Sequence, residues 1–130
     1  MRVLITGATG FVGQTLVQKV NKSYDVIALV RAQSSLLSPS VRQLVANNIF
    51  KAEFLENIDV IVHLAGRAHI LNEQTTDPLT EFRKVNVEGT LQLARQALEK
   101  KVKRFIFMSS IGVNGSVTLH QPFTEDALPQ

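Results

Sequence analysis

The sequence of 130 residues contains no cysteine and no tryptophan, and its only tyrosine is Tyr24. The absence of cysteine excludes disulfide bonds and thiolate-ligated metal, and it is consistent with a reducing compartment. No stretch approaches the roughly 20 apolar residues that a membrane-spanning helix requires, and the apolar start at residues 1–5 gives way to glycine too early for a secretion signal. We therefore expect a cytoplasmic protein without a membrane span.

Charged side chains are few and dispersed. They make up 19% of the residues, the formal net charge is +3, and 45% of the residues are hydrophobic. This composition is typical of a chain that buries a core, and the scattered cations do not predict a nucleic-acid surface. The one basic cluster, residues 100–104, falls where a long helix is expected to end, and the helix dipole favours cations there. His63 and His69 lack a third ligand at suitable spacing, so no metal site is predicted.

Short apolar runs alternate with helical patterns along the chain. A helix follows the first run over about residues 12–20, and a weak helix is expected at residues 51–56. This order predicts an α/β protein with a Rossmann-type, doubly wound parallel sheet of about five strands. The runs expected to form strands are residues 2–5, 25–30, 41–45, 59–64 and 104–108, of which the last four are expected to be buried on both faces. The irregular segments are residues 32–40 and 112–130.

A long helix is predicted over residues 78–100, where Asp77 can cap the first turn and Pro78 suits its first position. Two apolar stripes on different sides of this helix indicate two packing partners. The sheet is one; the other is either a second subunit in a homodimer or another helix of the same chain. The first stripe comprises Phe82, Val85, Asn86, Gly89 and Leu93, and the second comprises Val87, Leu91, Ala94 and Leu98.

Three glycines, Gly7, Gly10 and Gly13, follow the first predicted strand and open the first predicted helix. Glycines at this place permit a tight turn, let a pyrophosphate approach the backbone and let the helix pack closely on the strand. Free amides and the positive end of the helix then hold the phosphates. The spacing is G-x-x-G-x-x-G and not G-x-G-x-x-G, and glycine-rich turns also form for structural reasons, so a dinucleotide site is one of two interpretations.

The second predicted strand ends in Arg31. An acidic residue at this position would bind the ribose hydroxyls of NAD(H), whereas arginine favours the 2′-phosphate of NADP(H). The sequence therefore favours NADP(H) over NAD(H). The alternative is that Arg31 is a solvated charge in a loop.

Three further motifs occur in order: His63-Leu64-Ala65-Gly66, Asn86-Val87-Glu88-Gly89-Thr90 and Phe105-Ile106-Phe107-Met108-Ser109-Ser110. Together with the glycine turn they resemble the extended short-chain dehydrogenase/reductases, and within them the NAD(P)-dependent nucleotide-sugar epimerases and dehydratases. The resemblance covers residues 1–130 as the N-terminal part of a dinucleotide-binding domain. It implies hydride transfer between NAD(P) and a nucleotide sugar, by an epimerase or a 4-keto-sugar reductase of bacterial surface polysaccharide synthesis. The alternative is a non-catalytic NAD(P)-binding or sensor module.

The resemblance also implies roles for individual residues. Ser110 would be the catalytic serine that hydrogen-bonds the reacting sugar oxygen, Ser109 its structural neighbour on the cofactor side, and Asn86 the support of a proton-relay water. An Asn86 amide bonded only to a neighbouring carbonyl is the alternative. The positions implied for the cofactor are Gly7, Gly10, Phe11, Val12 and Gly13 at the pyrophosphate, Asn48 and Ile49 at the adenine, and Leu64, Ala65 and Gly66 beneath the ribose and phosphates.

The Tyr-x-x-x-Lys pair of this family is not found in the sequence. A phenol with a pKa near 10 needs an adjacent ammonium to transfer a proton near neutrality. By the family spacing the pair would begin near position 135, beyond Gln130, and Tyr24 precedes the second strand at the wrong edge of the sheet. We therefore expect that these 130 residues alone do not turn over substrate.

Overall fold

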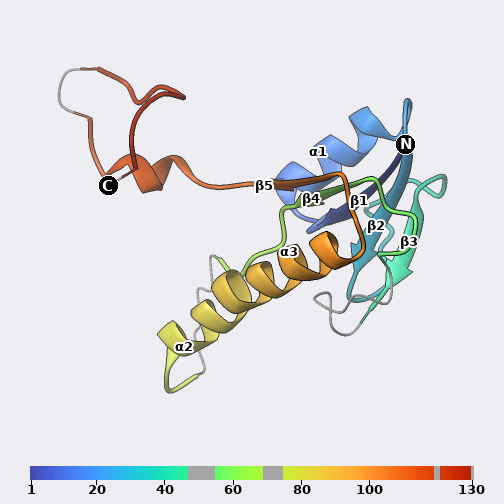
Figure 1. Cartoon of the computed structure of the whole chain (residues 1–130), viewed down its shortest axis with the longest axis horizontal. Helices are drawn as coiled ribbons and strands as arrows, with labels where there is room; N and C mark the ends of the chain where they lie inside the picture. Colours follow the sequence, from blue (N-terminus) through green and yellow to red (C-terminus); the bar gives the residue numbers. More distant parts are fainter. Residues whose placement is uncertain (47–54, 69–74, 119–120, 130) are drawn as a thin grey trace.

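The computed structural model describes residues 1–46, 55–68, 75–118 and 121–129. Five parallel strands form one sheet in the order β3-β2-β1-β4-β5 (Figure 1). The chain builds outward from β1 on one side and then crosses over to add β4 and β5 on the other. The Rossmann-type sheet is confirmed, with each strand within one residue of its expected limits: β1 (Arg2–Thr6), β2 (Asp25–Val30), β3 (Arg42–Val45), β4 (Val60–His63) and β5 (Arg104–Phe107).

The helices agree with the sequence pattern except in one segment. The long helix runs from α2 (Pro78–Arg83) through a π-helical segment, η2 (Lys84–Gly89), into α3 (Thr90–Glu99). The sequence pattern does not reveal the π-helical turns, which are rare and often lie at functional sites. The carboxylate of Asp77 caps the helix as predicted, accepting a 3.1 Å hydrogen bond from the Thr80 amide. The other helices are α1 (Phe11–Val20) and the short 3₁₀ turn η3 (Ile111–Asn114).

The weak helix expected at residues 51–56 lies mostly outside the described residues, and Leu55 and Glu56 are not helical. Among the helices of the described ranges, none combines the length and the apolar character that crossing a bilayer would require.

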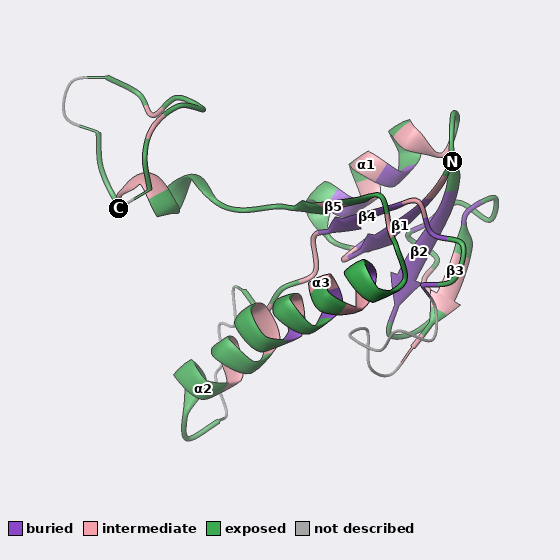
Figure 2. Cartoon of the chain, viewed as in Figure 1, coloured by how far each residue is buried: buried purple, intermediate pink, exposed green. Residues whose placement is uncertain are grey.

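Two cores cover the two faces of the sheet (Figure 2). Alternate residues of a strand point to opposite faces, so Val3 and Ile5 of β1 join the core beneath α1 while Leu4 joins the core beneath α3. Val17 closes the first core, and Leu93 of the long helix is fully buried in the second. Gly89 and Leu93 of the first predicted stripe are buried, so this is the stripe that faces the sheet.

The prediction of burial on both faces is correct for the central strands and wrong for the two edges. Every residue of β4 is buried, whereas in β5 Ile106 and Phe107 are 47% and 53% exposed, and no residue of β3 is fully buried. An edge strand has a neighbour on one side only, which apolar composition alone does not reveal. After β5 the chain leaves the sheet and runs away from it (Figure 1).

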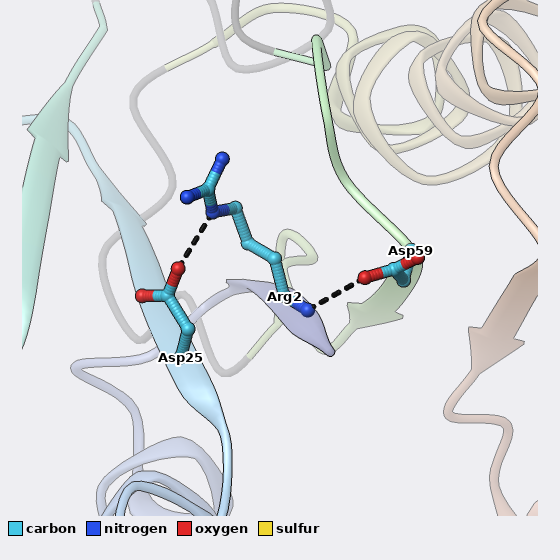
Figure 3. A network of polar contacts seen from close by, with 3 residues as sticks. All are labelled: Arg2, Asp25 and Asp59. Atoms are coloured by element: carbon cyan, nitrogen blue, oxygen red, sulfur yellow. Dashed lines mark hydrogen bonds and ion pairs between the residues drawn. The ribbon is translucent and has the colours of Figure 1, made fainter.

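Charged groups join the amino ends of β1, β2 and β4 (Figure 3), and Lys103 extends the contacts to β5. The Arg2 guanidinium pairs with Asp25 at 2.7 Å, and the Arg2 amide donates to the Asp59 carboxylate at 2.8 Å. Lys103 donates to the same carboxylate at 2.6 Å. The Lys103 hydrogen bond, followed by that of the Arg2 amide, lowers the pKa of Asp59. A carboxyl group whose pKa is lowered by folding stabilises the folded protein, and this stabilisation is lost as the pH falls from the ordinary carboxyl pKa through the lowered one. We therefore expect the contribution of Asp59 to the free energy of unfolding to disappear in acid.

Candidate functional site

All five strands are parallel, so their carboxyl ends lie at one edge of the sheet. The glycine turn follows β1 there, Arg31 follows β2, residues 64–66 follow β4, and Ser109 and Ser110 follow β5 after one residue. The order of the strands reverses between β1 and β4, and ligands of open α/β sheets bind at such a switch point. The fold therefore brings three of the sequence motifs, together with Arg31, to the carboxyl ends of the strands.

The glycine turn closes against the loop that follows β4. Gly7 has a left-handed φ of +68°, and a Cβ atom there would lie 2.7 Å from both the Ala65 nitrogen and the Leu64 carbonyl carbon. The Gly10 amide donates to the Gly7 carbonyl at 3.0 Å. A Cβ on Gly13 would lie 2.1 Å from that same carbonyl oxygen. Only glycine therefore permits both the turn and the close approach of α1.

The start of α1 is open. Gly10 is its N-cap, no side chain caps it, and no acidic residue stands in its first turn. Phe11 is 93% exposed and Val12 is half exposed, so apolar side chains do not cover the turn. The first amides of a helix have no partner within the helix, and they lie at the positive end of the helix dipole. This end of α1 is therefore suited to an anion.

Residues 64–66 form a strap beside the glycine turn, and Thr6 and Asn86 fix its position. The Leu64 amide donates to the Thr6 carbonyl at 3.2 Å, and the Ala65 amide donates to Thr6 Oγ1 at 3.1 Å. The Asn86 side chain lies directly beneath the strap, because a Cβ on Gly66 would be 3.3 Å from Asn86 Oδ1. The strap consequently presents main chain and small side chains at the edge of the sheet.

The Asn86 amide is held by a residue 19 positions away. Its Oδ1 accepts from the Arg67 amide at 2.6 Å, and its Nδ2 donates to the Arg67 carbonyl at 2.9 Å. The Arg67 guanidinium in turn lies 5.3 Å above the centre of the Phe82 ring. The sequence placed Asn86 in an apolar stripe of the long helix but did not predict these partners. Asn86 of the π-helical segment thus holds the main chain of Arg67, the residue that follows the strap; we call this pair of hydrogen bonds the Asn86 clamp.

The two candidate serines lie on the exposed segment that follows β5. The Met108 amide donates to the His63 carbonyl at 3.2 Å, which fixes the base of this segment to β4. Ser110 is the N-cap of η3, and its Oγ accepts from the Gly112 amide at 3.1 Å. Because Oγ acts as an acceptor there, the Ser110 hydroxyl hydrogen can be donated to a ligand.

The remaining candidates divide between described and undescribed residues. Arg31 is exposed at the carboxyl end of β2. Asn48, Ile49 and His69 lie outside the described residues. His63 is buried at the end of β4, and the sequence did not predict its polar contacts with Thr6 and Thr90. The only indication of these contacts in the sequence is that a polar residue, His63, ends an otherwise apolar strand.

The sheet order, the left-handed glycine turn and the uncapped helix define a Rossmann-type α/β domain. A model of the NAD dependent epimerase/dehydratase family matches residues 3–130. The chain belongs to this family.

Known proteins of several kinds are similar to the chain. UDP-glucose 4-epimerase of Vibrio cholerae is 43% identical over 123 residues, which cover 90% of this chain and 37% of that protein. The photosystem II assembly factor Ycf39 of Synechocystis is 34% identical over 116 residues, covering 84% and 33%. The solved structure of MoeE5 in complex with UDP-glucose and NAD matches with a TM-score of 0.79 and 28% identity, covering 100% and 42%. The chain thus spans roughly two fifths of the length of these proteins.

Gly13 and Gly10 of the glycine turn should differ in how much stability is lost when each is replaced by alanine. Gly13→Ala places a Cβ 2.1 Å from a main-chain oxygen, whereas Gly10→Ala places one at 3.2 Å on an exposed residue. We expect Gly13→Ala to lower the free energy of unfolding by on the order of 1–3 kcal/mol, as overpacking does, and Gly10→Ala to lower it less. Urea unfolding of both variants measures the difference. Equal losses would contradict the assignment of Gly13 to the contact between helix and turn.

Proposed function

We propose that the chain is the NAD(P)-binding part of a nucleotide-sugar epimerase or 4-keto-sugar reductase. The observation that carries the proposal is the main-chain contact between the Gly7 turn and residues 64–66, beside the uncapped start of α1. A pyrophosphate fits there, because the first amides of a helix bind phosphate and no Cβ of Gly10 obstructs their approach. The bound nicotinamide would supply the hydride chemistry, while the protein orients it.

The strap and the end of β2 would hold the other parts of the cofactor. Leu64, Ala65 and Gly66 would pass beneath the ribose and phosphates, where small residues let the main chain come close. Arg31, at the end of β2, supports a preference for NADP(H) through its 2′-phosphate. Asn48 and Ile49 stay in the proposal as the adenine contacts that the family resemblance implies.

Ser110 and Asn86 are the residues proposed for the chemistry. The Ser110 hydroxyl donates to the sugar oxygen that gains or loses a hydride, while its oxygen keeps the bond from the Gly112 amide. Ser109 supports it on the cofactor side. Asn86 uses one Nδ2 hydrogen for the Arg67 carbonyl, so its second hydrogen is available to a relay water. Neither residue determines whether the sugar carbon is epimerised or reduced.

A non-catalytic NAD(P)-binding or sensor module is the second candidate. The similarity to a protein named as an assembly factor favours it. The Asn86 clamp on Arg67 also gives Asn86 a structural purpose, which removes part of the case for catalysis. Ser110 is then the residue that separates the two candidates, since a sensor has no need of a hydroxyl at the sugar.

We also propose that a second copy of the chain covers the outer face of the long helix. Val87, Leu91 and Leu98 are exposed there, Leu98 by 79%. Together with Ala94 they are spaced by four, three and four residues, the spacing at which two helices pack along an apolar seam. A symmetric pair would therefore bury this stripe on both copies.

The cofactor proposal is tested by titration calorimetry of the chain with NADP⁺ and with NAD⁺. We expect tighter binding of NADP⁺, and Arg31→Ala should raise its dissociation constant at least tenfold, because a charge-assisted hydrogen bond contributes about 1.5–3 kcal/mol. Binding of NAD⁺ should not change. Arg42→Ala, at the start of β3 and paired with Ile27 in the middle of β2, is the matched control. Tighter binding of NAD⁺ by the wild type would refute the role of Arg31, and binding of neither would refute the function.

The choice between enzyme and sensor is tested with Ser110→Ala and Ser109→Ala in the natural gene product that carries this chain. For an enzyme, turnover of UDP-glucose or of a 4-keto nucleotide sugar should fall about 10²-fold or more in Ser110→Ala, because a hydrogen-bond donor to the reacting oxygen is lost. Ser109→Ala should lose much less turnover, and NADP⁺ affinity should stay constant in Ser110→Ala. Absence of turnover in the wild type supports the sensor.

The proposed dimer is tested by light scattering. The wild type should have twice the 14.4 kDa mass of one chain at high concentration, and Leu91→Glu/Leu98→Glu should be monomeric with unchanged circular dichroism. Leu128→Glu, exposed on the distant C-terminal segment, is the control. A wild type that stays monomeric at every concentration argues for a different partner on this face.

A further inference from the structure

The His63 side chain connects three elements at the carboxyl edge of the sheet. Its ring is buried at the end of β4, with Nδ1 2.7 Å from Thr6 Oγ1 on β1 and Nε2 3.0 Å from Thr90 Oγ1 at the start of α3. Thr6 Oγ1 is also the acceptor of the Ala65 amide at 3.1 Å. The contacts therefore run from the strap through Thr6 and His63 to the long helix.

The protons of this chain of contacts can be counted. The Ala65 amide is necessarily a donor, so Thr6 Oγ1 accepts from it and has one hydroxyl hydrogen of its own. If Nδ1 of His63 carried a proton, Thr6 would accept twice, and its hydrogen would have no acceptor among the described residues. Thr6 is fully buried, where an unpaired hydroxyl hydrogen is costly. The consistent arrangement has Thr6 donating to Nδ1 and Nε2–H donating to Thr90.

We propose that His63, as the neutral Nε2–H tautomer, is the positioning residue of the cofactor strap. Its Nδ1 orients the Thr6 hydroxyl, which fixes the Ala65 amide, and its Nε2–H anchors the ring to Thr90. This inference rests on the proposed function, because it takes the strap to be the part of the loop that meets the dinucleotide. His63 itself touches neither substrate nor cofactor.

Packing alone does not account for a histidine here. The ring lies 5.9 Å from the Phe105 ring and 6.0 Å from the Phe107 ring, an aromatic environment that another aromatic side chain would also fill. What histidine adds is an acceptor on one side of the ring and a donor on the other. Burial lowers the pKa of His63, which favours the neutral ring that this arrangement requires.

A matched pair of variants separates the two ends of the ring. Asn at position 63 places an amide oxygen near the position of Nδ1, whereas Gln places its amide near Nε2. We expect His63→Asn to bind NADP⁺ within about threefold of the wild type and His63→Gln to bind it about tenfold more weakly. Thr6→Val should weaken binding as His63→Gln does, and Thr6→Ser should restore it. Equal losses for Asn and Gln, or losses that follow the unfolding midpoints alone, would overturn the proposal.

The tautomer is measured independently of any nucleotide. Nitrogen-15 NMR of the imidazole in the full chain should show a protonated Nε2 and an unprotonated Nδ1. A protonated Nδ1 in a chain that binds NADP⁺ normally would overturn the assignment of His63 alone. A wild type that binds neither NADP⁺ nor NAD⁺ would overturn the proposed function, and with it the purpose given to the strap.

Discussion

The site depends on one contact between two stretches of main chain. Thr6 and His63 are paired across β1 and β4, so the loops that leave these strands begin side by side. A Cβ on Gly7 would stand 2.7 Å from the next loop, which means that the two backbones touch. Because they touch, the turn, the strap and the first amides of α1 lie side by side at the carboxyl ends of the strands. Neither loop could provide this arrangement by itself.

The rest of the fold keeps these two loops in register. One core beneath α1 and another beneath α3 fix both faces of β1 and β4, and the Arg2–Asp25 and Arg2–Asp59 contacts hold the opposite ends of the strands. Hydrogen bonds of Asn86 and His63 then connect the long helix to the strap side of the sheet. The two loops are therefore held in place by the packed sheet and by the long helix.

The sequence predicted whatever depends on local pattern. Strand limits, the Asp77 cap, the inward stripe of the long helix and the glycine turn all follow from residue spacing, and the structure agrees. It did not predict contacts between distant residues, such as Asn86 with Arg67 or His63 with Thr90. Periodicity shows that a polar residue faces the core, but its partner is chosen by tertiary packing. The exposure of β5 was missed for the same reason, because strand composition does not reveal which strands stand at an edge.

The groups that would hold a dinucleotide and those that would perform chemistry differ in kind. The groups that would hold the dinucleotide are main-chain amides and small residues whose positions are fixed by strand pairing, so the fold itself provides them. The groups that would perform chemistry reduce to Ser110 and Asn86, and Asn86 already serves the main chain of Arg67. A fold hosts many functions, and function resides in particular side chains. The case for nucleotide binding is consequently structural, whereas the case for hydride transfer depends on a single exposed hydroxyl that follows β5.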